Sequence, residues 1–292
     1  MYELIQLTEH DYYIDCPAKI GLVVSGSGEA VLIDSGNDKD AGKKVMRIIQ
    51  EKGWTVKAVL NTHSHADHTG GNRFLQEKTG CDIYASDLES VYAGNPVLEP
   101  VGLYGGLPFK SLRNKFLMAQ ESKVLPLTEE VLPQGMRLIP LPGHCFSMTG
   151  FLTADGTAYI ADCVSSEETL EKYGIGYLWD PEASLNTLEV VKTLEAKRFV
   201  PSHAPVTENI VPLAELNIQA IQTVKERLKD WCVHPVTFDR LLKMVFDAYG
   251  LQMTAQQFVL IGSTVRSYLS SMVDHGEITF EFIENEMFWK TV

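Results

Sequence analysis

Paired cysteines, a long apolar run and an excess of positive charge are all missing from this 292-residue sequence. Its five cysteines are scattered and include no CxxC pair, which argues against a disulfide scaffold and fits a reducing compartment. No run of 18 apolar residues occurs, so we expect no membrane-spanning helix. The first residues are neither basic nor strongly apolar, so we also expect no signal peptide and a cytoplasmic location. The net charge of −13 disfavours a surface that binds nucleic acid in general.

Strand and helix patterns alternate along the first 211 residues. Residues 19–36 form two apolar runs around a Gly-Ser-Gly turn, which predicts a hairpin, and a helix with Val45, Ile48 and Ile49 on one face follows. Alternation of this kind indicates an α/β layer architecture. After residue 211 the pattern changes to helices followed by two short strands around a Glu-Asn turn, so we predict domains at 1–211 and 212–292.

Four metal-binding side chains crowd into the segment NTHSHADHTGGN, residues 61–72. In an extended chain, positions i and i+2 point the same way, so His63 and His65 can share one ion. The chain then turns, and Asp67 and His68 can face a second ion. A polar loop with hydrogen-bonded histidines is the alternative, which four donors in six positions disfavour.

Three further donors, His144, Asp162 and His203, each follow an apolar run that predicts a strand. A lone aspartate at the end of a buried strand is costly unless it meets a cation. Each donor taken alone could be structural. Taken together, they predict a shared site at the ends of neighbouring strands.

The segment THSHADH resembles the HxHxDH signature of the metallo-β-lactamase superfamily, and PGH, IADC and PSH around the later donors match its other motifs in order. The resemblance covers residues 1 to about 211. It implies an αββα sandwich of two mixed sheets flanked by helices, with two divalent metal ions at one edge: zinc in the first place, with iron or manganese as alternatives. Asp34, in LIDSG, matches a family position whose side chain orients the metal ligands without binding the metal itself. The alternative is that Asp34 is an ordinary turn aspartate. The resemblance assigns His63, His65 and His144 to one ion, Asp67, His68 and His203 to the other, and Asp162 and a hydroxide to both.

The implied activity is hydrolysis by metal-activated water, with Asp67 accepting or relaying the proton. We expect a small ester, thioester or lactone as the substrate. His65 argues against flavo-diiron proteins, which carry glutamate there, and Ser165 weakens the likeness to acyl-homoserine lactonases, which carry tyrosine. Secreted B1 and B2 lactamases carry cysteine in place of Asp162. Glyoxalase II-like thioesterases share all seven ligands, but their glutathione-binding basic residues cannot be matched here, and the intact second set of ligands disfavours persulfide dioxygenases.

Residues 212–292 resemble the winged-helix extension of a superfamily branch that includes a single-strand-specific endoribonuclease. This likeness keeps two alternatives open: a phosphodiesterase acting on RNA, and a regulator that binds DNA through the tail and uses the sandwich as a metal sensor. Residues 234–292 hold four Lys or Arg and seven Asp or Glu, which disfavours contact with phosphates. We therefore expect the tail to pack, to form a homodimer or to cover the active site.

Residues 103–120 contain three basic residues and no acidic one, in a chain of net negative charge. This local positive charge could attract an anionic small molecule. The segment is also largely apolar, so a core role is the alternative. We predict a lid or pocket wall in which the substrate contacts are Lys110, Arg113, Phe109 and Phe116.

Overall fold

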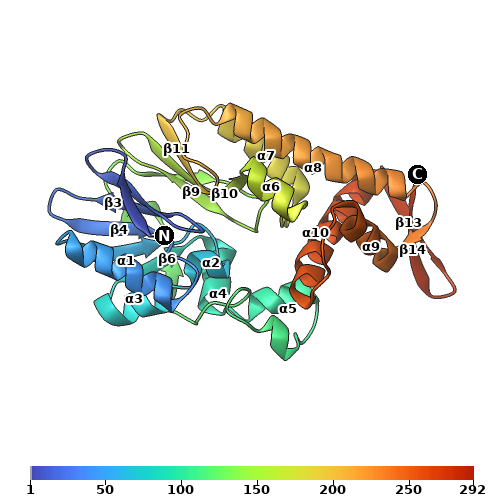
Figure 1. Ribbon diagram of the computed structural model, residues 1–292, viewed down its shortest axis with the longest axis horizontal. Coiled ribbons are helices and arrows are strands. Elements are labelled where there is room, and N and C mark those ends of the chain that lie inside the picture. The colour runs from blue at the N-terminus through green and yellow to red at the C-terminus, as the bar shows by residue number, and fades with distance from the viewer. Residues whose placement is uncertain (1) are drawn as a thin grey trace.

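The computed structural model describes residues 2–292 and stacks two β-sheets face to face between outer layers of helices (Figure 1). The first sheet has seven strands in chain order, antiparallel from β1 to β4 and parallel from β4 to β7. The strands of this sheet are β1 Glu3–Gln6, β2 Asp11–Asp15, β3 Ile20–Val24, β4 Glu29–Ile33, β5 Thr55–Leu60, β6 Asp82–Ala85 and β7 Val124–Pro126.

The second sheet has four strands in the order β11-β10-β9-β8. It is also mixed, because β10 and β11 are parallel whereas β8, β9 and β10 are antiparallel. Its strands are β8 Arg137–Pro140, β9 Thr149–Leu152, β10 Thr157–Ser165 and β11 Arg198–His203.

The central strands are apolar on both faces because each face is covered. In β4, Leu32 packs under the helices of the first layer, while Val31 and Ile33 point to the opposite sheet. In β10, Ile160 packs under the outer helices and Tyr159 points between the sheets. This burial on both sides explains why the strands appear in the sequence as continuous apolar runs.

Helices α1 Lys39–Glu51 and α3 Asn72–Thr79 cover the first sheet, and α7 Pro181–Lys192 and α8 Val211–Trp231 cover the second (Figure 1). The predicted αββα sandwich of two mixed sheets is therefore confirmed. No helix within residues 2–292 is both long enough and apolar enough to cross a membrane. The shorter helices are α2 Ala66–Thr69, α4 Asp87–Gly94, α5 Leu98–Tyr104, α6 Glu167–Tyr173 and the 3₁₀ turns η1 Lys110–Leu112 and η2 Glu129–Val131.

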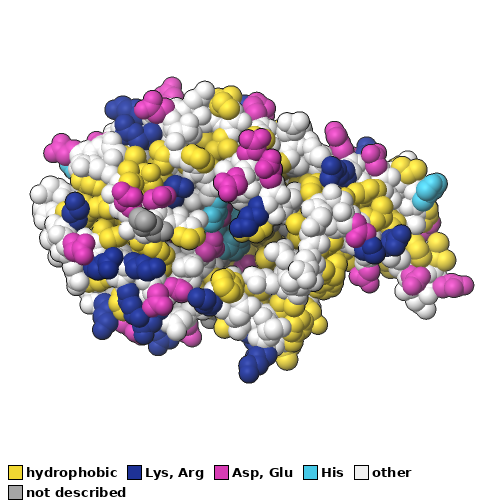
Figure 2. Space-filling model, in the orientation of Figure 1, with side chains coloured by type: hydrophobic (Ala, Val, Ile, Leu, Met, Phe, Trp, Pro, Cys, Tyr) yellow, Lys and Arg dark blue, Asp and Glu magenta, His cyan; other side chains and the backbone are white. Residues whose placement is uncertain are grey.

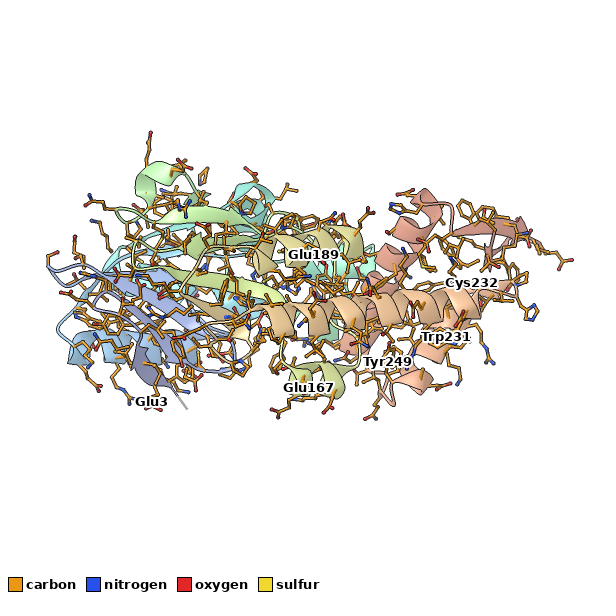
Figure 3. All side chains as sticks on the ribbon, turned by 90° about the horizontal axis from the view of Figure 1, so that it is seen from above. Glu3, Glu167, Glu189, Trp231, Cys232 and Tyr249 are labelled. Atoms are coloured by element: carbon orange, nitrogen blue, oxygen red, sulfur yellow. The ribbon has the colours of Figure 1, made fainter. Side chains whose placement is uncertain are left out.

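A small C-terminal unit lies at the far end of α8, which runs from the sandwich to Trp231 and is followed directly by Cys232 (Figure 3). The unit has its own apolar core, formed by α8, two helices and a three-stranded sheet in the order β12-β14-β13. The predicted hairpin is present, with Glu284 and Asn285 of the turn at positive φ. The elements are β12 Val236–Thr237, α9 Phe238–Ala248, α10 Ala255–Asp274, β13 Ile278–Ile283 and β14 Glu286–Thr291.

Helix α10 joins the C-terminal unit to the sandwich. Its residue Val259 is buried in one cluster with Leu103, Leu112 and Leu117. The 103–120 segment thus supplies core residues that hold α10 in place, which is the alternative role considered for this segment.

Candidate metal centre

Three imidazoles from two loops converge at the edge of the sandwich. His63 and His65 follow β5, and His144 lies between β8 and β9. His65 Nδ1 lies 3.1 Å from His63 Nε2 and 3.1 Å from His144 Nε2. One imidazole nitrogen cannot donate to both neighbours, because it carries at most one proton. The three nitrogens are instead arranged to bind one cation from three sides.

A second group lies beside the first and combines Asp67, His68, Asp162 and His203. Asp162 Oδ1 lies 3.2 Å from His68 Nε2, and its Oδ2 lies 3.1 Å from His203 Nε2. Asp162 Oδ2 is also 3.7 Å from His144 Nε2 in the first group. The carboxylate of Asp162 therefore faces both groups.

The second ring nitrogen of every one of these histidines has a partner of its own. His63 Nδ1 lies 2.9 Å from Thr62 Oγ1, and His65 Nε2 lies 3.5 Å from Glu99 Oε1. The three remaining partners are Asp34 Oδ2 for His68 Nδ1 at 2.8 Å, the Tyr177 carbonyl for His144 Nδ1 at 3.1 Å and the Pro17 carbonyl for His203 Nδ1 at 3.0 Å. Carboxylate and carbonyl partners accept an N–H, which leaves the other ring nitrogen free to bind a cation.

Unpartnered buried atoms mark the same place. Among residues 2–292, five buried side-chain atoms lack a hydrogen-bond partner, and His68 Nε2 and Asp162 Oδ1 are two of them. His68 lies in α2, which follows β5 of the first sheet, and Asp162 lies in β10 of the second sheet, and the two atoms are 3.2 Å apart. Buried polar atoms left without partners cost free energy, which a bound cation would recover. The residues present therefore fit a two-ion site.

Burial and neighbouring charges act differently on the two groups. Burial lowers the pKa of His63, and it lowers that of His144 to about 4. Burial acts to raise the pKa of Asp67 and Asp162, but His68 and His203 lower both below the usual value. Burial thus favours neutral imidazoles in the first group. In the second group the carboxylates raise the pKa of His68, and that of His203 to about 10, so a cation bound there would displace the protons of these two imidazoles.

Local backbone features aim these side chains. A methyl group on Gly71 would lie 2.3 Å from the Ser35 carbonyl oxygen, so only glycine lets this turn pack against the end of β4. Ala161 has φ of 50° at a register shift between β10 and β11, and such an irregularity re-aims the next side chain, here Asp162.

A buried glutamate ties the two histidine loops together, and sequence reasoning missed it. Glu89 Oε2 accepts the backbone N–H of Ser64 at 3.0 Å, and Oε1 accepts that of Ser147 at 2.9 Å. Glu89 is fully buried. Because its partners lie 25 and 58 residues away, no local motif could point to it.

The metal groups open into a cleft of about 490 Å³ between the sandwich and α10. Figure 2 shows histidine side chains exposed in the hollow between the two parts of the molecule. Of the four substrate contacts predicted in the 103–120 segment, Phe116 lines this cleft, together with its neighbour Lys115. Lys110, Arg113 and Phe109 are not among the lining residues, so their contact with substrate stays a prediction.

Comparison with known proteins gives one family match. The model of the metallo-beta-lactamase superfamily matches residues 13–203. Among curated proteins, a hydroxyacylglutathione hydrolase from Rhodospirillum rubrum is 44% identical over 167 residues, which is 56% of this chain and 54% of that protein. One of the same name from Methylococcus capsulatus is 26% identical over 183 residues, 62% of this chain and 57% of that protein. The chain thus spans about half the length of these relatives.

Two solved structures share the whole arrangement. A metallo-beta-lactamase family protein from Thermus thermophilus has a TM-score of 0.74 at 16% identity and covers 100% of this chain and 98% of its own. A beta-lactamase domain protein from Burkholderia ambifaria has a TM-score of 0.74 at 15% identity, covering 99% of this chain and 94% of its own. At such low identity these likenesses show the fold, including that of the C-terminal unit.

Proposed function

Because the chain belongs to the metallo-β-lactamase superfamily, we propose that it is a dinuclear, metal-dependent hydrolase that cleaves a small ester, thioester or lactone. Zinc is the metal we propose first, since imidazole and carboxylate ligands suit it. The observation that carries the proposal is the pairing pattern of the five histidines: a partner outside the two donor groups holds one ring nitrogen of each, and the other ring nitrogen faces the donors of its own group.

Two bound cations would polarise the scissile carbonyl and lower the pKa of a water molecule between them. The chain itself supplies orientation and a proton acceptor. Asp67 is the more exposed carboxylate of the site, with 43% of its side-chain surface accessible against 10% for Asp162. Its lowered pKa keeps it ionised at neutral pH, so it can accept the proton released when water attacks and return it to the leaving group.

Tyr177 and the partners of the histidines keep this arrangement rigid. The Tyr177 carbonyl orients His144, while its ring packs edge-on against His65 at a centroid distance of 5.3 Å. Ligands held in place before the substrate arrives need no reorganisation during the reaction.

The choice of an ester over a phosphodiester follows from the charge of the cleft. Lys115 is the one Lys or Arg that lines the cleft within the described chain, and Asp38 already pairs with it at 2.9 Å. A polyanion would need several unpaired cations. The relatives named hydroxyacylglutathione hydrolase point, by that name, to a thioester.

A hydrolysis screen with metal analysis of the same sample tests the proposal. The panel should contain thioesters, lactones, phosphodiesters and single-stranded RNA. We expect two ions per chain and turnover of the carbonyl substrates, lost on chelation and restored by zinc. Turnover of RNA or phosphodiesters alone would replace this proposal with the phosphodiesterase, and two bound ions without turnover of any substrate would contradict hydrolysis.

A further inference from the structure

The C-terminal unit forms part of the cleft that contains the metal groups. Gln256, Gln257, Leu260, Ile261 and Thr264 of α10 line the same cavity as the metal groups. These residues lie at i, i+1, i+4, i+5 and i+8, which is one face of the first half of the helix. The face that α10 turns to the sandwich is therefore a pocket wall as well as a packing surface.

The walls opposite α10 come from the catalytic sandwich and are mainly apolar. Leu170 and Tyr173 of α6, Tyr177 and Phe116 enclose the space in front of the metal groups. A smaller cavity of about 90 Å³ shares His144, Asp162 and Tyr177 with the cleft and continues between Ile221, Val224 and Tyr268. The space next to the reacting centre thus extends into apolar surroundings.

Charged groups are nearly absent from these walls. Apart from the candidate metal ligands, Lys115 is the only charged residue that lines the cleft in the part of the chain described, and Asp38 neutralises it. Glutathione carries two carboxylates, which this lining offers no free cation to meet. An uncharged group needs no cation to pair with when it moves from water into the cleft.

We propose that the α10 face and the α6–Tyr177 wall form the acyl pocket of this protein, and that the pocket takes an uncharged, largely apolar acyl group of medium length. The inference rests on the proposed hydrolase function and names the substrate class for that site. The volume of about 490 Å³ lies in the range of pockets that enclose whole small molecules. The two glutamine amides at the mouth can bind an uncharged polar substituent without requiring a charge.

Kinetics of the zinc-loaded, full-length protein test the pocket. The probes are thioesters of the neutral thiol N-acetylcysteamine with acetyl, butyryl, hexanoyl and succinyl groups, and lactoylglutathione. Since each extra methylene in an apolar pocket favours binding, we expect kcat/KM to be roughly tenfold or more higher for hexanoyl than for acetyl. Butyryl should exceed succinyl by a similar factor, because the added carboxylate meets no cation.

A matched pair of variants locates the effect. Gln257→Lys places a cation on the α10 face, whereas Gln252→Lys places one in the exposed turn before the helix and outside the cleft. Gln257→Lys should raise the succinyl-to-butyryl ratio of kcat/KM roughly tenfold, and Gln252→Lys should leave it unchanged.

The outcomes separate this inference from the proposed function. If lactoylglutathione or the succinyl thioester is the best substrate of the unmodified protein, or if Gln257→Lys changes nothing, the acyl pocket is refuted while the hydrolase stands. If protein that holds two ions cleaves none of these thioesters and no lactone of the screen above, the hydrolase proposal itself fails.

Discussion

Asp34 Oδ2 lies 2.8 Å from His68 Nδ1, and both side chains are almost completely buried. The same carboxylate accepts the Thr62 backbone N–H and hydroxyl, both at 2.8 Å, and Thr62 in turn faces His63. One aspartate therefore orients an imidazole in each of the two metal groups. Its own φ of 67° lies in the left-handed region, a strain that these contacts compensate.

Replacing Asp34 by Ala should lower zinc affinity roughly 10- to 100-fold, because His68 loses its acceptor and Thr62, the partner of His63, loses the carboxylate that holds it. Competition with a chromophoric chelator measures this. Asp40→Ala removes an exposed aspartate from the first turn of α1 and serves as the control. Equal affinities for the two variants would mean that Asp34 is only a turn residue.

Asp162 faces both metal groups, so its loss should reduce the number of bound ions. We expect elemental analysis to find two ions per chain in the unmodified protein after reconstitution, and at most one in Asp162→Ala. Circular dichroism should show the sandwich still folded, since its core lies elsewhere. One ion in the unmodified protein would contradict the two-ion site, and two in the variant would contradict the shared role of Asp162.

Glu89→Gln should destabilise the protein, because an amide can accept only one of the two backbone N–H bonds and turns a donor toward the other. Leaving one buried N–H unsatisfied costs about 1–3 kcal/mol of unfolding free energy, measurable by urea denaturation. Glu171→Gln, at an exposed site on α6, is the matched change. We also expect Glu89→Gln to weaken zinc binding, since Ser64 and Ser147 belong to the two loops that carry the first metal group. Unchanged stability and zinc affinity would show that the hydrogen bonds of Glu89 to Ser64 and Ser147 have no such role.

Thr264→Val tests how α10 supports the sandwich. Thr264 Oγ1 accepts the backbone N–H of Leu178 at 3.2 Å and donates to the carbonyl of Leu260. Thr223→Val removes the same kind of bond to the preceding turn in α8, but no bond to another element, so it is a close control. Loss of the additional hydrogen bond from Leu178 should lower the free energy of unfolding of Thr264→Val by about 1 kcal/mol more than that of Thr223→Val. Calorimetry of thermal unfolding measures this difference. An equal loss in both would assign no role to the bond with Leu178.

The sandwich could be predicted from the sequence, and the donor residues that the structure brings together could be named, because both leave local signals. Strands buried on two faces are continuous apolar runs, and His63, His65, Asp67 and His68 stand together at the end of one of them. His144, Asp162 and His203 needed the added order of the motifs. Each of these motifs is a short segment of residues that are adjacent in the chain.

What the sequence could not predict depends on contacts between distant segments. Glu89 acts through Ser147, and Tyr177 meets His144 from 33 residues away. For the 103–120 segment the sequence left a lid or pocket wall and a core role open, and the structure shows its leucines anchoring α10 and Phe116 lining the cleft. Only the packing of the two units shows that the first turns of α10 line a pocket.

The short segment between α6 and α7 has a further consequence. Tyr177 accepts from His144, and the next residue, Leu178, donates to Thr264 of α10. We therefore expect metal binding at His144 and docking of the C-terminal unit at Thr264 to be thermodynamically linked, and linkage is reciprocal. The free energy by which docking strengthens metal binding equals the free energy by which the bound metal strengthens docking. Hydrogen exchange in α9, which contributes no residue to the cleft, should accordingly slow when zinc is added, so the distal unit reports the loading of the metal site.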